Sequence, residues 1–97
     1  SSDLTMNNIF NIYKGVPNPT QLVLAPRVNT DLSSAKIEIF NFQKTKVFEF
    51  TVGSGLTINS GKIYVSQEIQ NLKNGDYTAI LYLLNAKSSN PLILKVK

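Results

Sequence analysis

Side chains able to act as acids, bases or nucleophiles are few in this 97-residue chain, which has no His and no Cys. That composition removes thiol nucleophiles, disulfides, the usual zinc ligands and the commonest general base. The carboxylates that remain as candidates are Asp31, Glu38, Glu49, Glu68 and Asp76. No His, Cys or glycine-rich partner accompanies any of them, so we expect no enzyme, no cofactor, no metal site and no small-molecule ligand.

Glu38 and Glu49 are the carboxylate pair whose spacing suggests acid–base chemistry. They lie at comparable distances from a polar turn, so a hairpin would place them near each other. Lys36 and Lys46 share their outward face, and solvated surface ion pairs are therefore the favoured interpretation. The glycines at residues 53–55 do not predict a phosphate loop, because the Lys and the following helix of such loops are missing.

The composition is that of a single soluble globular domain, with 42% apolar and 16% charged residues. Apolar runs are far shorter than the roughly 18 residues of a membrane span. The net charge is +4, but Arg27 is the only arginine and the lysines are scattered along the chain. We therefore expect neither nucleic acid nor a membrane as a partner.

The first residues of the chain are polar and unpatterned, and Met6 is the only methionine. We interpret residues 1–5 as a cloning remnant or a disordered tail, and residues 6–97 as one domain. A start at Met6 would give a protein without an export signal, made in the cytoplasm. Alternatively, Met6 is internal and a signal has been removed before it.

Apolar residues recur with a period of two, and clusters of Gly, Pro, Asn and Ser interrupt the chain at short intervals. This pattern predicts an all-β chain with one short helical turn at residues 66–72 and a loop at residues 28–34. The predicted strands are residues 8–13, 20–25, 36–42, 46–52, 56–58, 62–65, 76–84 and 91–97. The strand at residues 76–84 is apolar on both faces and should be central.

The alternation also predicts which side chains share the inward faces. Those expected to form the core are Leu22, Leu24, Leu92, Leu94 and Val96, with Leu32 closing one end, whereas the buried face of strand 36–42 is left open. Phe48, Phe50 and Val52 are expected to share one face of their strand.

Leu72, Gly75 and Tyr77 form the pattern L-x-x-G-x-Y at the start of a long apolar strand. In Greek-key sandwiches such a tyrosine folds back so that its hydroxyl meets upstream backbone, the tyrosine corner, while the glycine permits the tight turn. With about seven strands and a final hairpin, this favours an immunoglobulin-like antiparallel β-sandwich with Greek-key connections over a small barrel. The absence of Cys and Trp argues against an antibody-type domain.

Over residues 9–97 the order of these motifs resembles the amino-terminal immunoglobulin-like domains of phage tail and baseplate upper proteins. The matched positions are Asp31, Leu32, Ala35 and Ile37, then Leu56, Ile58, Gly61, Ile63 and Val65, then Leu72, Gly75 and Tyr77. All of them are fold determinants, and the phenylalanine content of residues 40–50 departs from the family pattern. The resemblance implies a component of a tail, baseplate or capsid-decoration assembly that contacts other virion proteins or itself.

Four of the five phenylalanines lie within residues 40–50, in one predicted hairpin. If the isoleucines of strand 36–42 point inward, Phe40 and Phe42 are exposed or covered by a partner, and exposed aromatic residues are efficient anchors. The favoured alternative is that the phenylalanine face is the inward one, or that the strand is buried on both sides. Phe40, Phe42 and the basic Lys95 are nonetheless the candidate partner contacts, although Lys95 on a last strand also discourages edge pairing.

The leading hypothesis is a non-catalytic virion module, made in the host cytoplasm, that docks to other phage proteins through strand edges and the phenylalanine hairpin. The second hypothesis is an extracellular bacterial adhesion or carbohydrate-binding module, although the hairpin lacks Trp and Tyr for sugar stacking. A small intracellular inhibitor or host-takeover protein is a weaker third hypothesis. A true start at Met6 would favour the virion module over the extracellular module, because the protein would then have no export signal.

Overall fold

Alternating apolar residues form β-strands in the structure, a computed structural model that describes residues 9–13, 22–26, 31–83 and 91–97. The strands in chain order are β1 (Ile9–Ile12), β2 (Leu22–Leu24), β3 (Lys36–Phe40), β4 (Lys46–Val52), β5 (Gly55–Asn59), β6 (Lys62–Val65), β7 (Gly75–Tyr82) and β8 (Leu92–Val96). Two short 3-10 helices, η1 (Leu32–Ser34) and η2 (Gln67–Asn71), are also present. The described residues contain no α-helix. The all-β prediction is therefore confirmed.

Each of the eight predicted strands is present, and the clearest difference is that β3 ends at Phe40 instead of residue 42. Some predictions lie outside the described residues. They concern the tail at residues 1–5, the start at Met6, Arg27, and the first part of the loop predicted at residues 28–34. In the part of the chain that is described, no helix has the length and apolar character required to cross a membrane.

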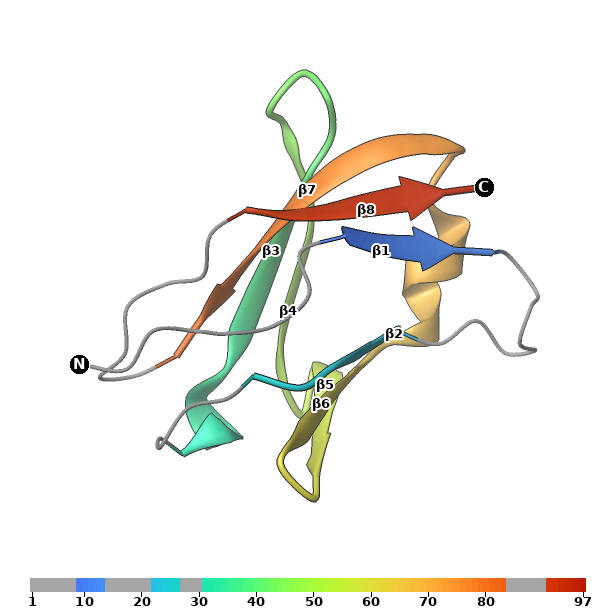
Figure 1. The fold of residues 1–97 in the computed structure, drawn as a ribbon. Helices are drawn as coiled ribbons and strands as arrows, with labels where there is room; N and C mark the ends of the chain where they lie inside the picture. The colour runs from blue at the N-terminus through green and yellow to red at the C-terminus, as the bar shows by residue number, and fades with distance from the viewer. Residues whose placement is uncertain (1–8, 14–21, 27–30, 84–90) are drawn as a thin grey trace.

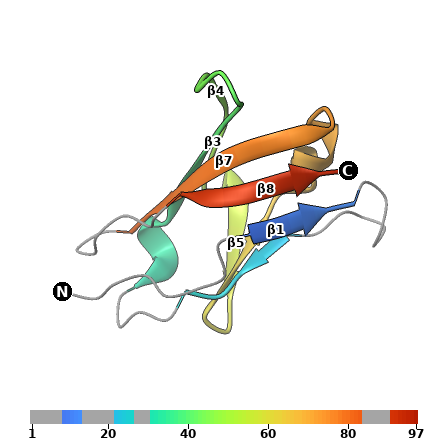
Figure 2. The same cartoon turned by 45° about the horizontal axis from the view of Figure 1, so that its top comes forward.

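The eight strands form one mixed sheet in the order β1-β8-β7-β3-β4-β5-β6-β2. The sheet curls until it nearly closes into a barrel, with β1 and β2 at its two ends (Figure 1, Figure 2). Five neighbouring pairs are antiparallel, whereas β1–β8 and β4–β5 are parallel. The antiparallel arrangement predicted from the sequence is therefore wrong for two of the seven pairs.

Two parts of the sheet can be distinguished by how they are joined. The five-stranded part consists of β1, β8, β7, β3 and β4, and the three-stranded part consists of β5, β6 and β2. Two register pairs connect them, Thr51 with Gly55 and Val52 with Leu56. In Figure 1 the three-stranded part lies across the lower side of the molecule, opposite β7 and β8.

At the β4–β5 junction a tight turn brings Gly55 beside Thr51, and β5 then continues parallel to β4. Gly53 and Gly55 have φ values of +85° and +104°, which residues with a Cβ rarely adopt. The Thr51 N–H donates to the Ser54 carbonyl at 3.1 Å, and the Ser54 N–H donates to the Thr51 carbonyl at 2.8 Å. A period-two pattern defines the face of a residue but not its neighbouring strand, so it does not reveal this parallel pairing.

Buried side chains from both parts form one hydrophobic core. The five-stranded part contributes Ile12, Ile37, Ile39, Phe50, Ala79, Leu81, Leu92, Leu94 and Val96, and the three-stranded part contributes Leu22, Leu24, Leu56, Ile63 and Val65. The inward faces predicted for β2 and β8 are therefore confirmed, and on β3, where the sequence left the buried face open, the inward side chains are Ile37 and Ile39. On β4, Phe48 packs against the core only partly and Val52 is 38% exposed.

The predicted helical turn at residues 66–72 is η2, and it closes one end of the core. Ser66 begins it, because its hydroxyl accepts a hydrogen bond from the Glu68 N–H at 3.1 Å. Ile69 and Leu72, three residues apart, are both buried in the core. On the other side Leu32 of η1 packs against the core, which agrees with its predicted position.

Candidate functional site

The tip of the β3–β4 hairpin presents Phe42, the most exposed large apolar side chain among the described residues at 83%. Asn41 orders this turn, because its Oδ1 accepts hydrogen bonds from the N–H groups of Gln43 (2.9 Å) and Thr45 (3.0 Å). Backbone bonds from Asn41 to Thr45 and from Lys44 to Asn41, both 2.9 Å, complete it. The aromatic ring is therefore held in solvent by a turn that is already ordered.

The two faces of β3 are clearly different. Ile37 and Ile39 are buried, whereas Phe40 is half-buried on the outward face together with Glu38. The favoured interpretation, in which both phenylalanines are buried, is therefore wrong for Phe42 and correct only in part for Phe40. The physical reason is that β3 ends before Phe42, so this side chain leaves the sheet at the turn.

Lys95, the third predicted contact residue, lies half-buried on β8, opposite Asp76 on β7 and Asn11 on β1. Phe40 is opposite Thr78 on β7, and Thr78 is opposite the residue two positions before Lys95 on β8. Because side chains two positions apart on a strand share a face, Lys95 lies on the same outward face as Phe40. The structure thus brings Phe40 and Lys95 onto one face and leaves the hairpin tip beyond it.

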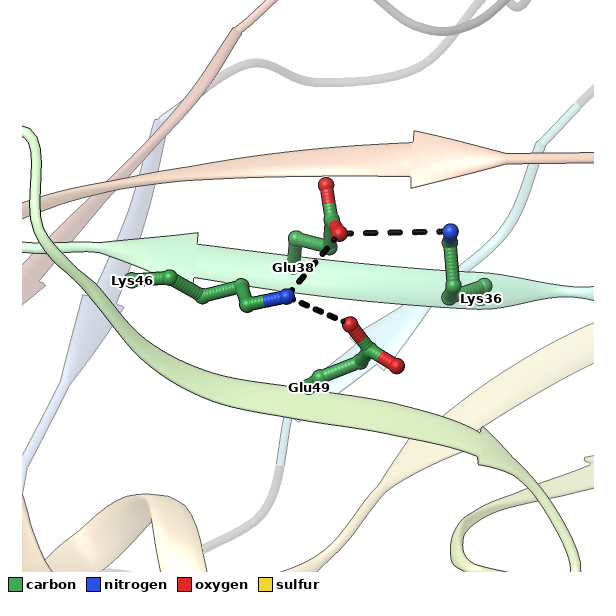
Figure 3. A network of polar contacts seen from close by, with 4 residues as sticks. All are labelled: Lys36, Glu38, Lys46 and Glu49. Carbon is green, nitrogen blue, oxygen red and sulfur yellow. Dashed lines mark hydrogen bonds and ion pairs between the residues drawn. The ribbon is translucent and has the colours of Figure 1, made fainter.

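Four charged side chains form a network on the outward face of the hairpin (Figure 3). Glu38 and Glu49 are register partners, as the hairpin spacing predicts. The Lys46 Nζ donates to Glu49 Oε1 at 2.7 Å and to Glu38 Oε2 at 3.4 Å. The Lys36 Nζ lies 3.9 Å from Glu38 Oε2. We call these four residues the charged network, and the prediction of surface ion pairs is confirmed.

The pairing in the charged network favours the ionised forms of its groups. The hydrogen bond from Lys46 lowers the pKa of Glu49 and, reciprocally, raises the pKa of Lys46. On β7, a hydrogen bond to Glu38 raises the pKa of Tyr82, and the Lys36 Nζ lies 4.9 Å from the centre of its ring. Sequence reasoning missed Tyr82, because only the β3–β7 register places it opposite Lys36.

The L-x-x-G-x-Y motif orders the entry into β7. The Tyr77 hydroxyl donates to the backbone carbonyl of Lys73, four residues upstream, at 2.8 Å. Gly75 has a φ of +143°, a conformation that strains residues with a Cβ, and Leu72 is buried in the core. Because the Tyr77 ring also packs against the core, these contacts have an architectural role.

A shallow hollow of about 400 Å³ lies between η1 and the β4–β5 junction. Its lining residues are Asp31, Ser33, Val52, Gly53, Leu56, Thr57 and Ile58. Asp31 is the charged group of this lining, and its two oxygens accept hydrogen bonds from the Ser33 N–H (2.9 Å) and hydroxyl (2.8 Å). The described residues contain no group of three or more His, Cys, Asp or Glu side chains that would hold a metal ion.

No protein-family model matches this sequence, and no curated protein matches it either. The function is therefore inferred from the surface of the molecule. Two features of that surface are the Phe42 tip and the outward face of the five-stranded part.

Proposed function

We propose that this chain is a non-catalytic structural module of a bacteriophage virion, in the tail, the baseplate or the capsid decoration, and that it binds other virion proteins. The observation that carries the proposal is Phe42, a large aromatic side chain held 83% exposed at an ordered hairpin tip. The virion context is taken from the resemblance of residues 9–97 to the amino-terminal domains of phage tail and baseplate upper proteins.

Phe42 has the properties of a binding anchor. An aromatic ring that inserts into a partner pocket contributes more binding energy than most contacts around it. Because Asn41 already orders the turn, little conformational entropy is lost when the ring becomes buried. The exposed Lys44 in the same turn favours a partner pocket with an acidic rim.

We further infer that the eight strands form an immunoglobulin-like sandwich whose two sheets are the five-stranded and the three-stranded parts. Support comes from the path of the chain. β2 belongs to the three-stranded part, β3 and β4 to the five-stranded part, β5 and β6 to the three-stranded part, and β7 and β8 to the five-stranded part. Greek-key connections produce such alternation, and the Tyr77 to Lys73 bond is the contact expected of a tyrosine corner.

The test of the function is a capture experiment with two immobilised baits, the wild-type chain and Phe42→Ser. Lysates of infected and uninfected cells are compared by quantitative mass spectrometry. We expect the wild-type chain to enrich tail, baseplate or capsid proteins from the infected lysate, and Phe42→Ser to lose at least about 90% of that enrichment. Because Phe42 lies exposed in a turn, the variant should keep the wild-type melting temperature.

Other outcomes would contradict the proposal in distinct ways. Equal enrichment of virion proteins by both baits would show that Phe42 is not the binding contact. Recovery of a single host enzyme would favour an inhibitor. Retention on cell-wall glycans without virion proteins would favour the adhesion or carbohydrate-binding module.

A further inference from the structure

The hollow between η1 and the β4–β5 junction has the size and lining of a site for an aromatic side chain. Its volume of about 400 Å³ lies within the range of protein binding pockets. Val52, Leu56 and Ile58 give it an apolar wall, and Val52 is 38% exposed. At Gly53 the lining is bare backbone, because no described residue other than its chain neighbours has an atom within 4 Å of the position that a Cβ would occupy. A planar ring therefore fits against apolar side chains and exposed backbone.

The hollow carries a negative charge at its edge. Asp31 is exposed and is the ionisable side chain among its lining residues. Hydrogen bonds from the Ser33 N–H and hydroxyl lower the pKa of Asp31, so its carboxylate is ionised at neutral pH and keeps acceptor sites for a cation. Two lysines lie on neighbouring elements without lining the hollow. Lys36 is 3.9 Å from Glu38 in the charged network, and Lys62 begins β6.

The hairpin tip has the complementary features. Phe42 is 83% exposed, and the exposed Lys44 follows it in the same ordered turn. In the part of the chain that is described, Lys44 forms no ion pair, whereas Lys46 is held by Glu38 and Glu49. The tip thus presents one aromatic ring and one positive charge, which an apolar hollow with an acidic edge matches.

We propose that the hairpin tip of one copy of this chain inserts into the hollow of a second copy, with Phe42 against the apolar wall and Lys44 beside Asp31. This inference rests on the proposed function, because it takes Phe42 as the docking contact and names a second copy as a partner. A second copy is selected because this chain carries both halves of the contact, with opposite charges.

The two halves lie at opposite ends of the β3–β4 hairpin (Figure 1, Figure 2). β4 starts beside the tip at Lys46 and ends at Val52, which lines the hollow, and its seven residues span about 20 Å. A tip therefore does not reach the hollow of its own chain. Each pair of bound copies leaves one tip and one hollow unoccupied, so this head-to-tail contact continues beyond two chains, as an open filament or a closed ring.

Sedimentation equilibrium of the full chain from about 1 μM to about 1 mM tests the assembly. The contact is small and the net charge of +4 adds a general repulsion, so we expect a dissociation constant above about 1 μM. The weight-average mass should exceed two chains at the highest concentration. A chain that stays monomeric throughout, or that stops at two copies, would overturn the proposal.

Two variants each remove one half of the contact. Phe42→Ser removes the ring, and Thr57→Arg fills the hollow with a cationic side chain from an exposed position on β5. Each should weaken self-association at least about tenfold. Asn71→Arg is the matched control for charge, because it adds the same charge at the end of η2, away from η1 and the hollow, and should leave the assembly unchanged.

An equimolar mixture of Phe42→Ser and Thr57→Arg distinguishes a head-to-tail contact from any symmetric one. Phe42→Ser keeps its hollow and Thr57→Arg keeps its tip, so the mixture should form a one-to-one pair that does not grow further. We expect its dissociation constant to lie within about threefold of the wild-type value. If both variants keep the wild-type melting temperature and the mixture associates no better than either variant alone, the proposal is wrong.

Lys44→Asn tests the charge match. Asn tolerates the φ of +64° at this position, so the turn should remain intact. We expect the variant to weaken self-association about threefold. Lys73→Asn removes the same charge from an exposed position before β7 and should have no effect. Equal association of these two variants would overturn the pairing with Asp31 that selects a second copy.

The proposed function and this inference can fail separately. If the wild-type bait captures other virion proteins through Phe42 while the purified chain stays monomeric, the proposed function stands and the second copy is wrong. If the chain assembles head to tail but captures no virion protein, the assembly stands and the virion role is wrong.

Discussion

The five-stranded and three-stranded parts of the sheet are held together in different ways. In the five-stranded part, β3 pairs at five register positions with β7 and at five with β4. The three-stranded part is joined to it through only two register pairs, Thr51 with Gly55 and Val52 with Leu56. The Phe42 tip and the charged network both lie on the five-stranded part.

This difference separates two sources of stability. Backbone hydrogen bonds between neighbouring strands stabilise the five-stranded part, which carries the candidate contacts. The three-stranded part is held against it by side-chain burial and by one glycine-rich junction. Ile63 on β6 and Leu81 on β7 are both 0% exposed and belong to the same core. The two parts should therefore unfold in one cooperative transition, although few backbone bonds connect them.

Gly55→Ala should be the most damaging substitution, because it changes the junction between the two parts. A Cβ at Gly55 would overlap the ring of the buried Phe50, and the φ of +104° disfavours any L side chain. We expect the free energy of unfolding to fall by about 3 to 4 kcal/mol. Urea denaturation followed by circular dichroism measures it.

Gly53→Ala is the matched control for this prediction. Its φ of +85° imposes backbone strain, but nothing lies within 4 Å of the added Cβ. We expect a loss of about 1 to 2 kcal/mol, caused by strain alone. Equal losses at the two glycines would show that contact between residue 55 and Phe50 is not what fixes the junction.

Ile63→Ala tests whether the two parts share one transition. The substitution leaves a cavity on the three-stranded side of the core, so we expect a loss of about 3 kcal/mol with an unchanged dependence on urea. Leu81→Ala, on the five-stranded side, should have a similar effect. A second transition in Ile63→Ala alone would mean that the three-stranded part unfolds separately.

Tyr77→Phe tests the turn that leads into β7, within the five-stranded part. It removes the hydroxyl that donates to the Lys73 carbonyl, and we expect a loss of about 1 kcal/mol in the free energy of unfolding. Tyr64→Phe on β6 provides a comparison on the three-stranded part. An unchanged melting temperature for Tyr77→Phe would contradict the structural role of its hydroxyl.

Acid should reveal the smallest effect, which comes from the charged network. The hydrogen bond from Lys46 lowers the pKa of Glu49 below its ordinary value of 4.5. Because the folded-state pKa is lowered, this stabilisation is present above pH 4.5 and is lost as the pH falls through the folded-state value.

Thermal unfolding between about pH 6 and about pH 3 measures this effect. Glu49→Gln should lower the melting temperature slightly at pH 6 and should flatten its decline in acid. Glu68→Gln, an exposed carboxylate of η2 outside the charged network, is the control and should keep the wild-type slope. If the melting temperatures of Glu49→Gln and the wild-type chain declined equally with falling pH, the charged network would not be a source of acid sensitivity.

Period-two alternation was enough to predict the inward faces of β2 and β8, because the face of a residue follows directly from its position along a strand. Leu24 and Leu94 lie in the core for this reason. On β3 both faces carry apolar residues, so alternation did not decide between Ile37 with Ile39 and Phe40 with Phe42. The same pattern contains no information about which strands are neighbours. The parallel β1–β8 and β4–β5 pairs and the place of Tyr82 beside the charged network therefore required the structure.

The hairpin tip shows where a local signal was overlooked. Phe42 continues the alternation of strand 36–42, and the pattern therefore extends the strand through it. Asn41 contradicts that extension, because an Asn side chain can bond to backbone N–H groups further along and close a turn. Those bonds end β3 and expose Phe42, which is the basis of the proposed docking function.

The most direct test of the proposed virion role is whether this chain is part of purified phage particles. Particles isolated from an infected lysate by density-gradient centrifugation are analysed by quantitative mass spectrometry and by immunogold labelling. We predict a fixed number of copies per particle, with label at the tail, the baseplate or the capsid. Absence of the chain from the particles, with full recovery in the soluble lysate, would contradict the virion role even if Phe42 binds another protein.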